Sequence, residues 1–513
     1  MTGIVESLLS MSTTTITYPS VAAADVRSSN RAVWLGFAVV IGSAVMDLLD
    51  STIAQTAAPA IRRDLGGTYA DLEWITAAYT LAMSATLLLG SRLGDVLGRR
   101  RVLLAGIGGF VGASALCAVA PSPSALIAAR ALQGAIAALM VPQGFGLIRE
   151  LFGDHGQQKA FAVLGPVMGL AAVAGPLIGG GLVNLDVLGS GWRAIFLVNV
   201  PIGLLAIAAG RRYLPRVAPA TPGARLDAPS VLLAMFGAVA LVYPLIEGRE
   251  HGWPAWSFAA LAAGVVSLVA FAALQARRSQ QGRTPLVEPS ILGRRPYVAG
   301  LAVVLGFIGA MGGMMIALNV MYQTGLGFSP LACGVATVAI PVAAIGGSIT
   351  SSALLARIGR TTMQIGIVTM ATGLVVVDLV MRSASGGLTA WDLAGPLAIT
   401  GFGMGMVFVP MFDVILAGVA PHELGSASGL LESVQQLAMS LGIAAVGTEL
   451  FDHLGSGHGA AAFVGAADHG LLVAVAFLAA ACTAVFWLPK HARASHSDAQ
   501  GRGAGRRRSR LWR

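Results

Sequence analysis

Three ionisable side chains lie inside apolar segments long enough to cross a membrane, and their types and positions could support proton chemistry. Asp47 and Asp50 fall in the segment 33–57, and Arg130 falls in the segment 124–148. Placing an aspartate at the centre of a membrane helix costs about 3 kcal/mol on insertion scales, so the group must face water, pair with a cation or take a proton. A carboxylate that takes a proton on one side and releases it on the other can couple transport to a proton gradient. We therefore predict proton coupling at Asp50; a static hydrogen bond to a neighbouring helix is the alternative.

Helix geometry brings the other two groups near Asp50. Asp47 lies three residues earlier and therefore on the same helix face. We predict that it shares the proton, and a polar cavity wall or a substrate contact is the alternative. Arg130 and Asp50 both lie roughly 10 Å below the predicted outer surface, at a rise of about 1.5 Å per residue. Equal depth permits an ion pair that switches the charge state of Asp50, and a permanent structural pair is the alternative.

The composition indicates which elements must position these residues. Of the 513 residues, 56% are hydrophobic and 11% are charged, whereas soluble domains contain about 25% charged residues. We predict an all-α polytopic membrane protein with fourteen spans. The expected spans are 33–57, 72–90, 102–120, 124–148, 160–184, 192–211, 229–247, 257–276, 297–321, 331–356, 362–382, 392–417, 425–448 and 469–489.

The distribution of basic residues predicts the orientation of these spans. With the N-terminus inside, the inner loops and both tails hold 27 of the 33 Lys and Arg residues, and Arg130 lies within a span. The outer loops hold Arg62, Arg63, Arg193, Arg249 and Arg382. Such asymmetry is typical of cytoplasmic loops, so we expect both termini in the cytoplasm of a bacterium, with the chain in its cytoplasmic membrane. Basic charge placed this way indicates a lipid bilayer and argues against a nucleic-acid partner.

Several classes of site are not indicated. Cys117, Cys333 and Cys482 lie far apart in apolar runs, so they predict neither a disulfide framework nor a metal site. No phosphate-binding loop ending in Gly-Lys-Ser or Gly-Lys-Thr is present. We therefore expect no enzyme activity, no metal and no cofactor, and a transport step driven by the proton gradient.

The join between the second and third spans reads Leu-Gly-Asp-Val-Leu-Gly-Arg-Arg over residues 93–100. It resembles the signature loop between helices 2 and 3 of the major facilitator superfamily, with departures at Ser91 and Val96. The resemblance implies a loop that latches the two halves of the transporter in the outward-facing state. We assign that role to Asp95, Arg99 and Arg100, with Gly94 and Gly98 permitting the tight turn. Plain topology-setting charge is the alternative, but it leaves Asp95 unexplained.

Four further stretches extend the resemblance. Residues 49–59 and 192–203 resemble motifs of the fourteen-helix drug:proton antiporters, the EmrB/QacA type. Residues 130–134 resemble the superfamily's helix 4 motif, and residues 175–180 resemble the helix 5 motif of its antiporters. The resemblance implies two six-helix bundles around a central cavity, with two extra helices between them. We accordingly expect a disordered N-terminal tail at 1–32, bundles at 33–211 and 297–489, a linker with the extra helices at 212–296, and a basic tail at 490–513.

The stretch 175–180 corresponds to the helix 5 motif associated with antiporters. Proline removes a helix hydrogen bond and glycine permits close approach of a partner helix, so a kinked and tightly packed segment is expected. We predict a conformational hinge at Gly175, Pro176, Gly179 and Gly180. Ordinary close packing is the overlapping alternative.

Other polar residues are candidates for the central cavity. Glu432 lies beside two glutamines and is a candidate second cation or substrate site, together with Asp413, for which an interfacial position is the alternative. Candidates for the substrate cavity are Tyr79, Gln133, Tyr322 and Gln323, although aromatic residues in membrane helices more often serve packing.

Together these features predict efflux of amphipathic drugs, antibiotics or secondary metabolites in exchange for protons, by alternating access. The expected partners are the small-molecule substrate, protons and lipid, and we expect a monomer. A proton-coupled nutrient symporter or a uniporter of the same superfamily is the alternative.

Overall fold

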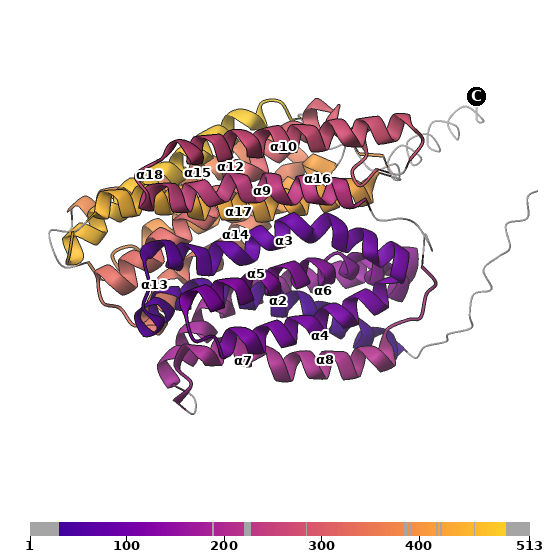
Figure 1. The fold of residues 1–513 in the computed structure, drawn as a ribbon, viewed down its shortest axis with the longest axis horizontal. Coiled ribbons are helices and arrows are strands. Elements are labelled where there is room, and N and C mark those ends of the chain that lie inside the picture. Colours follow the sequence, from indigo (N-terminus) through magenta and orange to yellow (C-terminus); the bar gives the residue numbers. More distant parts are fainter. Residues whose placement is uncertain are drawn as a thin grey trace, which may run out of the picture.

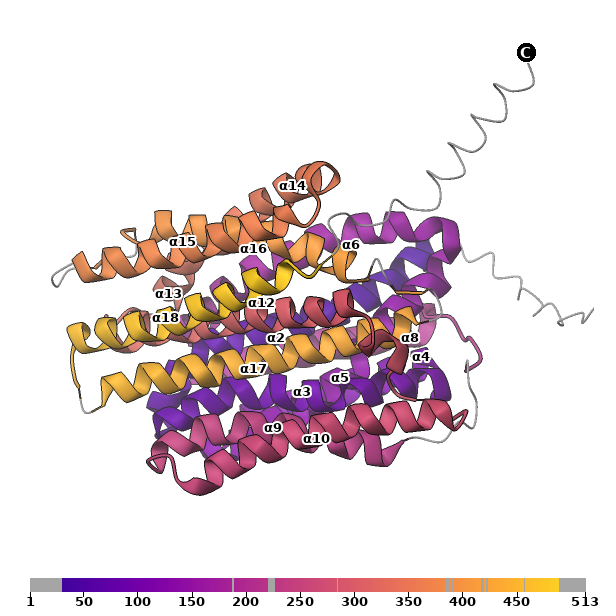
Figure 2. The same cartoon turned by 90° about the horizontal axis from the view of Figure 1, so that it is seen from above.

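The computed structural model is a bundle of long helices that lie side by side (Figure 1, Figure 2). It describes residues 30–186, 189–219, 227–283, 285–383, 388–389, 391–416, 419–420, 423–455 and 457–488, and these contain no strand. Of the tails predicted at 1–32 and 490–513, residues 1–29 and 490–513 lie outside the described residues, and residues 30–32 belong to the first turn of α2.

The helices follow one another with short joins. Those before residue 290 are α2 (Asn30–Leu65), α3 (Tyr69–Leu97), α4 (Arg99–Ala118), α5 (Pro123–Met140), α6 (Gln143–Leu185), η2 (Gly191–Arg193), α7 (Ala194–Leu197), α8 (Asn199–Tyr213), α9 (Ala228–Glu250) and α10 (Ala255–Gln280). The remaining ones are α11 (Pro289–Leu292), α12 (Arg295–Val320), the π-helix η3 (Met321–Gly325), α13 (Pro330–Thr337), α14 (Ala339–Ile358), α15 (Thr361–Ser383), α16 (Ala394–Leu416), α17 (Leu424–Leu454) and α18 (Ala460–Val485).

The described residues form 14 helices that are long and apolar enough to cross a membrane. This number confirms the predicted count of spans. Four spans are composite: α5 continues into the first part of α6, up to Gly153, η2, α7 and α8 form one span, α12 continues into η3, and α13 with α14 forms another. The chain is therefore a multi-pass membrane protein.

Local sequence sets where several spans begin. Thr68 precedes α3 and accepts a hydrogen bond from the Asp71 amide at 3.1 Å, while the Asp71 carboxylate accepts one from the Thr68 amide at 2.8 Å. Such a capping box satisfies amides that would otherwise lack partners. Ser122 caps α5 in a related way, with a proline at the first helical position. Gly98 separates α3 from α4 with a φ of 92°, a conformation that favours glycine.

The spans pack as two groups. In the first group, α2 to α8, α3 packs against α5 and α2 packs against α6. In the second group, α12 to α18, α12 packs against α17 and α18, and α14 packs against α16. The extra pair, α9 and α10, pack together, and α9 lies against both α3 and α17 (Figure 1). The boundaries expected near residues 211 and 296 stay a prediction.

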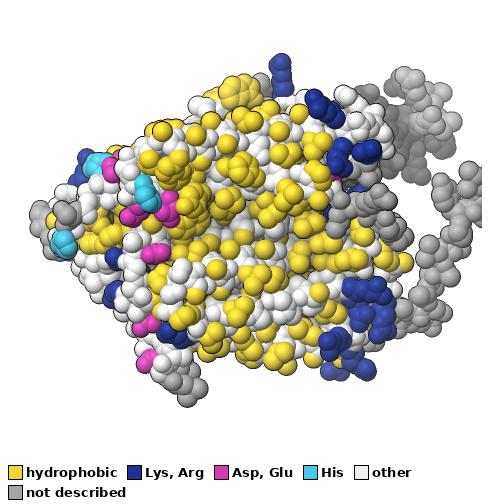
Figure 3. Space-filling model, viewed as in Figure 1, with side chains coloured by type: hydrophobic (Ala, Val, Ile, Leu, Met, Phe, Trp, Pro, Cys, Tyr) yellow, Lys and Arg dark blue, Asp and Glu magenta, His cyan; other side chains and the backbone are white. Residues whose placement is uncertain are grey.

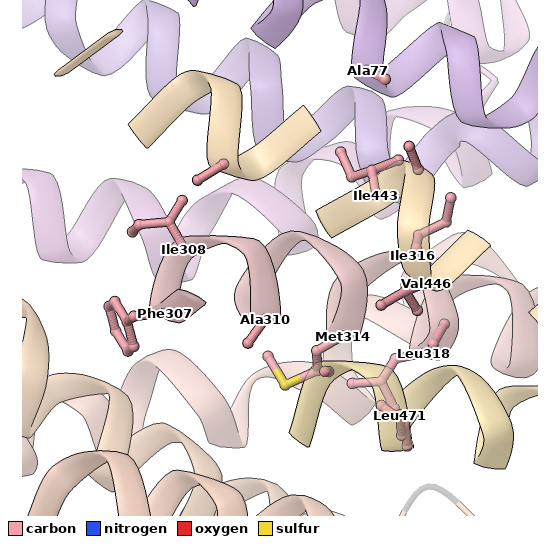
Figure 4. Packing of buried hydrophobic residues seen from close by; sticks show 14 of the residues in the cluster. Ala77, Phe307, Ile308, Ala310, Met314, Ile316, Leu318, Ile443, Val446 and Leu471 are labelled. Atoms are coloured by element: carbon pink, nitrogen blue, oxygen red, sulfur yellow. The ribbon is translucent and has the colours of Figure 1, made fainter. Parts of the chain in front are cut away.

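Apolar packing joins the two groups as well as filling each one. Met314 of α12 lies towards Leu471 of α18, whereas Ile443 of α17 and Ala77 of α3 lie on the other side of α12, and all four belong to one buried cluster (Figure 4). A Cβ at Gly442 would come within 1.9 Å of the Gly309 carbonyl oxygen, so α17 and α12 approach as closely as backbones can. The central contact of α12 and α17 therefore depends on small residues.

Charged side chains mark the two ends of the bundle. In Figure 3, most of the Lys and Arg side chains in view gather at one end, and the Asp, Glu and His side chains gather at the other. The first end, which includes Arg99, Arg211 and Arg277, is called the basic end below, and the second is called the opposite end. Hydrophobic side chains cover most of the surface between them, as expected for a surface in contact with lipid.

Candidate functional site

Asp50 of α2 lies at the centre of a buried polar network in the first group. Its side chain accepts three hydrogen bonds: from Arg130 Nη1 at 2.5 Å, from Gln133 Nε2 at 2.8 Å and from Asn199 Nδ2 at 2.7 Å. Asp50 is 2% exposed and Arg130 is 1% exposed. All three partners are donors, so the carboxylate oxygens act as the acceptors of every bond. Asp50 and Arg130 thus form the ion pair that their equal depth in the membrane made possible.

Ser114 of α4 completes the network. Its hydroxyl oxygen accepts from Gln133 Nε2 at 2.8 Å and from Asn199 Nδ2 at 3.2 Å. Side chains of α2, α4, α5 and α8 therefore meet at one point. Nothing in the sequence indicated that Ser114 belongs to a site, and Asn199 was part of the stretch 192–203 without a role of its own. The available signal was weak, because a single Ser or Asn in an apolar run is common in packed membrane helices.

The motif at 130–134 explains how α5 presents its polar side chains. Arg130 and Gln133 lie three residues apart on one helix face, and Arg130 Nη1 donates to Gln133 Oε1 at 2.7 Å. A Cβ at Gly134 would lie 2.0 Å from the Tyr79 carbonyl oxygen, so only glycine permits this approach of α5 to α3. Gln133 therefore belongs to the Asp50 network. Its predicted place in the substrate cavity stays a prediction.

Tyr79 of α3 connects the network to Asp47. Its hydroxyl donates a hydrogen bond to Asp47 Oδ1, and the Arg130 guanidinium lies 4.3 Å from the centre of its ring. Tyr79 is 1% exposed, whereas Asp47 is partly exposed. A cation over an aromatic face is an attractive arrangement. The two aspartates are therefore linked through Tyr79 and Arg130, and the sharing of a proton between them stays a prediction.

Glu432 of α17 faces the same region from the second group. Its carboxylate accepts a hydrogen bond from Gln435 Nε2 at 3.2 Å. Its predicted role as a second cation or substrate site stays a prediction. Asp413 is a residue of α16, but its side chain lies outside the described part, so its predicted role stays a prediction.

The segment 91–101 forms the end of α3, the Gly98 turn and the start of α4, and it contacts other helices of the first group. Arg99 pairs with Asp95 at 3.3 Å and with Glu150 of α6 at 3.2 Å. Arg100 donates to the carbonyl oxygen of Arg211 in α8 at 2.6 Å. A Cβ at Gly94 would lie 1.9 Å from Gln143 Oε1, so a glycine is needed there. All of these partners belong to the first group, and the predicted latch between the two groups stays a prediction.

The glycines of the helix 5 motif lie in tight contacts. A Cβ at Gly175 would lie 2.1 Å from Thr52 Oγ1, and one at Gly179 would lie 2.9 Å from Ile53 Cγ2, both in α2. On the other side, a Cβ at Gly180 would lie 2.5 Å from the Leu331 Cα atom in α13. The motif therefore packs α6 against both its own group and the second group.

Two details of the same motif refine this picture. A Cβ added at Gly334 of α13 would lie 2.6 Å from the Pro176 carbonyl oxygen. Both α6 and α13 therefore use glycine where they meet. The non-helical backbone angles within α6 occur at Gly153, with φ 63° and ψ −178°, and not at Pro176. Close packing is thus evident at the motif, and its role as a hinge stays a prediction.

Tyr322 and Gln323 lie in the π-helix η3 at the contact between the two groups. Gln323 Nε2 donates to the Thr56 carbonyl oxygen of α2 at 2.6 Å, and Tyr322 stacks on Phe328 with ring centres 5.3 Å apart. Both are buried. Their position at the opposite end indicates that they join the groups, and their assignment to a substrate cavity stays a prediction.

The comparisons with known proteins fit this geometry. The sequence profile described as Major Facilitator Superfamily matches residues 39–443. The chain belongs to the Major Facilitator Superfamily. This result confirms the resemblance found in the motifs, and the fourteen helices with their two groups confirm the predicted fold class.

Several members of the superfamily are similar along most of their length. The "Probable actinorhodin transporter" of Streptomyces coelicolor is 43% identical over 82% of this chain and 73% of its own length. The "Puromycin resistance protein pur8" of Streptomyces alboniger is 36% identical over 86% and 88%. The "Multidrug efflux pump LfrA" of Mycolicibacterium smegmatis is 31% identical over 82% and 81%.

Solved structures support the fold at lower identity. An auto-inhibited POT family peptide transporter matches with a TM-score of 0.63 at 16% identity, over 87% of this chain and 96% of that one. The nucleoside transporter NupG matches with a TM-score of 0.58 at 12% identity, over 88% and 99%. At such identities the likeness concerns the fold of the superfamily alone.

Proposed function

We propose that this transporter exports an amphipathic antibiotic or secondary metabolite in exchange for protons, by alternating access of the two groups. The similar export and resistance proteins support the direction and the class of substrate. The buried Asp50 network supports the proton coupling. The basic end faces the cytoplasm with both termini, as the positive-inside rule favours. The protein acts as a monomer and needs no cofactor besides the proton gradient.

The observation that carries the coupling is that Asp50 holds α2, α5 and α8 together through its negative charge. Taking up a proton removes that charge and turns one carboxyl oxygen into a donor, which Arg130, Gln133 and Asn199 would all oppose. Proton binding and the arrangement of these three helices are therefore linked, and by linkage a change in their arrangement changes the proton affinity of Asp50. This link is what an exchanger requires.

The partly exposed carboxylates Asp47 and Glu432 provide a second element of the proposal. They approach from opposite groups, so a cationic part of a substrate, or a second proton, between them would reduce their mutual repulsion. Such a ligand would favour the arrangement in which α2 of the first group and α17 of the second group both contact it. A change in the Asp50 network would also reach Asp47 through its hydrogen bond with Tyr79.

Everted membrane vesicles with a preset pH gradient provide the test, with puromycin and actinorhodin as the probes. Addition of a transported probe should dissipate the gradient in the wild type, and Asp50→Asn should abolish that response. Asp452→Asn removes an exposed carboxylate of α17 and should respond like the wild type. An undiminished response of Asp50→Asn would refute the assignment of Asp50, and uptake that rises with an inward proton gradient would indicate a symporter instead.

A further inference from the structure

A second buried ion pair lies at the opposite end of the bundle, outside the Asp50 network. Glu73 of α3 is 0% exposed, and its Oε1 atom lies 3.0 Å from Nη1 of Arg249 in the last turn of α9. The Arg249 side chain is 8% exposed, and its Nη2 atom pairs with the more exposed Glu250 at 3.1 Å. Breaking a buried pair by removing one partner is costly because the other charge is left without compensation. The pair therefore attaches α9 firmly to the first group.

Arg249 also reaches the second group. The same Nη1 atom donates to the Gly447 carbonyl oxygen of α17 at 3.2 Å, and the guanidinium lies 5.1 Å from the centre of the Phe451 ring. A Cβ at Gly447 would lie 2.7 Å from Glu73 Cδ, so α17 must present a glycine where it meets the carboxylate. Elements of the first group, the second group and the extra pair thus meet around one guanidinium.

Neighbouring residues repeat this pattern. Trp74 Nε1 of α3 donates to Glu247 Oε1 of α9 at 2.7 Å. On the other side, Thr448 Oγ1 of α17 donates to the Leu245 carbonyl oxygen of α9 at 2.6 Å. The last turns of α9 therefore hold the start of α3 and the end of α17 side by side, both at the opposite end of the bundle. Figure 1 shows the three helices next to one another.

The basic end of the extra pair has contacts to the second group. Gln275 Oε1 of α10 accepts from the Leu286 amide at 2.8 Å, and the Leu286 carbonyl oxygen accepts from Ser426 Oγ of α17 at 3.2 Å. Farther along the same segment, Arg294 pairs with Glu423 at 2.7 Å. These contacts attach the extra pair to the second group at the basic end as well, so α9 and α10 bridge the two groups along their length.

We propose that Arg249 makes α9 a third component of the gate at the opposite end, holding that end shut through Glu73 and Gly447. The inference rests on the alternating access of the proposed function, in which this end must open in turn. Opening separates α3 from α17 and exposes both charges to water, so Arg249 must give up either Glu73 or Gly447. The extra pair of helices thereby controls how readily the transporter opens on that side.

Distance measurements between two spin labels test the gate without substrate or proton gradient. Cysteines at Ser124 of α5 and Ala461 of α18, both exposed at the opposite end, carry the labels. The background has Cys117, Cys333 and Cys482 replaced by serine. Glu73→Gln and Arg249→Met should each raise the ratio of long to short distances about tenfold or more, since each leaves the closed state with an uncompensated buried group. Gly447→Ala should shift the ratio in the same direction by displacing Glu73.

Two controls separate a gate from a general loss of structure. Glu250→Gln removes the more exposed partner of the same guanidinium and should change the ratio less than about twofold. The double variant Glu73→Gln/Arg249→Met should shift the ratio by less than the product of the single shifts, because both changes remove one interaction. Variants that elute as monodisperse protein with unchanged distances, or single shifts that multiply in the double variant, would overturn the gate. Either result leaves the assignment of Asp50 untouched, because that assignment is tested by proton movement.

Discussion

Two buried ion pairs of this transporter have the same chemistry but different surroundings. Asp50 and Arg130 lie within the first group, and among the described residues no polar atom of their network lacks a hydrogen-bond partner. Glu73 and Arg249 join different parts of the bundle, and Glu73 Oε2 has no hydrogen-bond partner in the described part of the chain. In a fully satisfied network the arrangement of the donors depends on the charge of the carboxylate, whereas a partly satisfied pair between separable parts loses less when those parts move apart. The difference suggests that the first pair serves proton chemistry and the second serves gating.

The largest expected effect is on stability, and it concerns the satisfied pair. Arg130→Met removes the donor to Asp50 and leaves a buried carboxylate without its cation, which should lower the free energy of unfolding by about 3–5 kcal/mol. Thermal unfolding of the protein in detergent measures the loss. Arg193→Met, which removes one partner of the more exposed pair with Asp64, is the matched control and should cost less than about 1 kcal/mol. Equal losses in the two variants would remove the proposed distinction between buried and exposed pairs.

A smaller effect is expected at the contact of α6 with α13, which closes the opposite end without any charge. Gly180→Ala would place a Cβ 2.5 Å from the Leu331 Cα atom, and overpacking of this kind costs about 1–3 kcal/mol. We expect this change to favour opening of the same end, seen as a rise in the long distance between labels at Ser124 and Ala461. Gly181→Ala is the control, because a Cβ there meets nothing within 4 Å. A shift of the same size in both variants would show that helix propensity, not the contact, is responsible.

The smallest effect on stability is expected at the loop of the basic end. The Asp95 and Arg99 side chains are 32% and 33% exposed, so Asp95→Asn should cost less than about 1 kcal/mol of stability. Transport should nevertheless fall, with normal amounts of protein in the membrane, if Asp95 latches the two groups in the outward-facing state. Efflux assays alongside quantitation of the membrane-inserted protein measure both quantities. Normal transport would reduce the loop to a determinant of topology, and its ion pair would then be structural.

Much of the fold followed from local patterns. Apolar runs separated by short polar joins predicted the fourteen spans, because the length of a membrane helix is set by the thickness of the bilayer. Equal depth along two helices predicted that Asp50 and Arg130 could pair, and the structure brings them together. The motif glycines predicted close packing, which is present at Gly175 and Gly180. Each of these inferences depends on distances along one helix, which sequence specifies well.

Other features depended on which helices are neighbours, and hydropathy does not specify that. Asn199 and Ser114 complete the Asp50 network only because α8 and α4 lie beside α2 and α5. Gln323, predicted to line a cavity, bonds to the Thr56 carbonyl oxygen of the first group, while Tyr322 stacks on Phe328 within the second group. A polar or aromatic residue in a membrane helix must find a partner, but the sequence does not show whether the partner is substrate or another helix.

The sequence by itself determined that this chain crosses the membrane fourteen times and carries a carboxylate and a guanidinium at matching depth. Both results follow from hydrophobicity and helix rise, which act along the chain. Only the tertiary structure decided that Arg249, expected in an outer loop, is buried against Glu73, a residue 176 positions away. Lateral packing of helices determines such a contact, because small residues such as Gly447 permit the approach and a buried charge must be compensated.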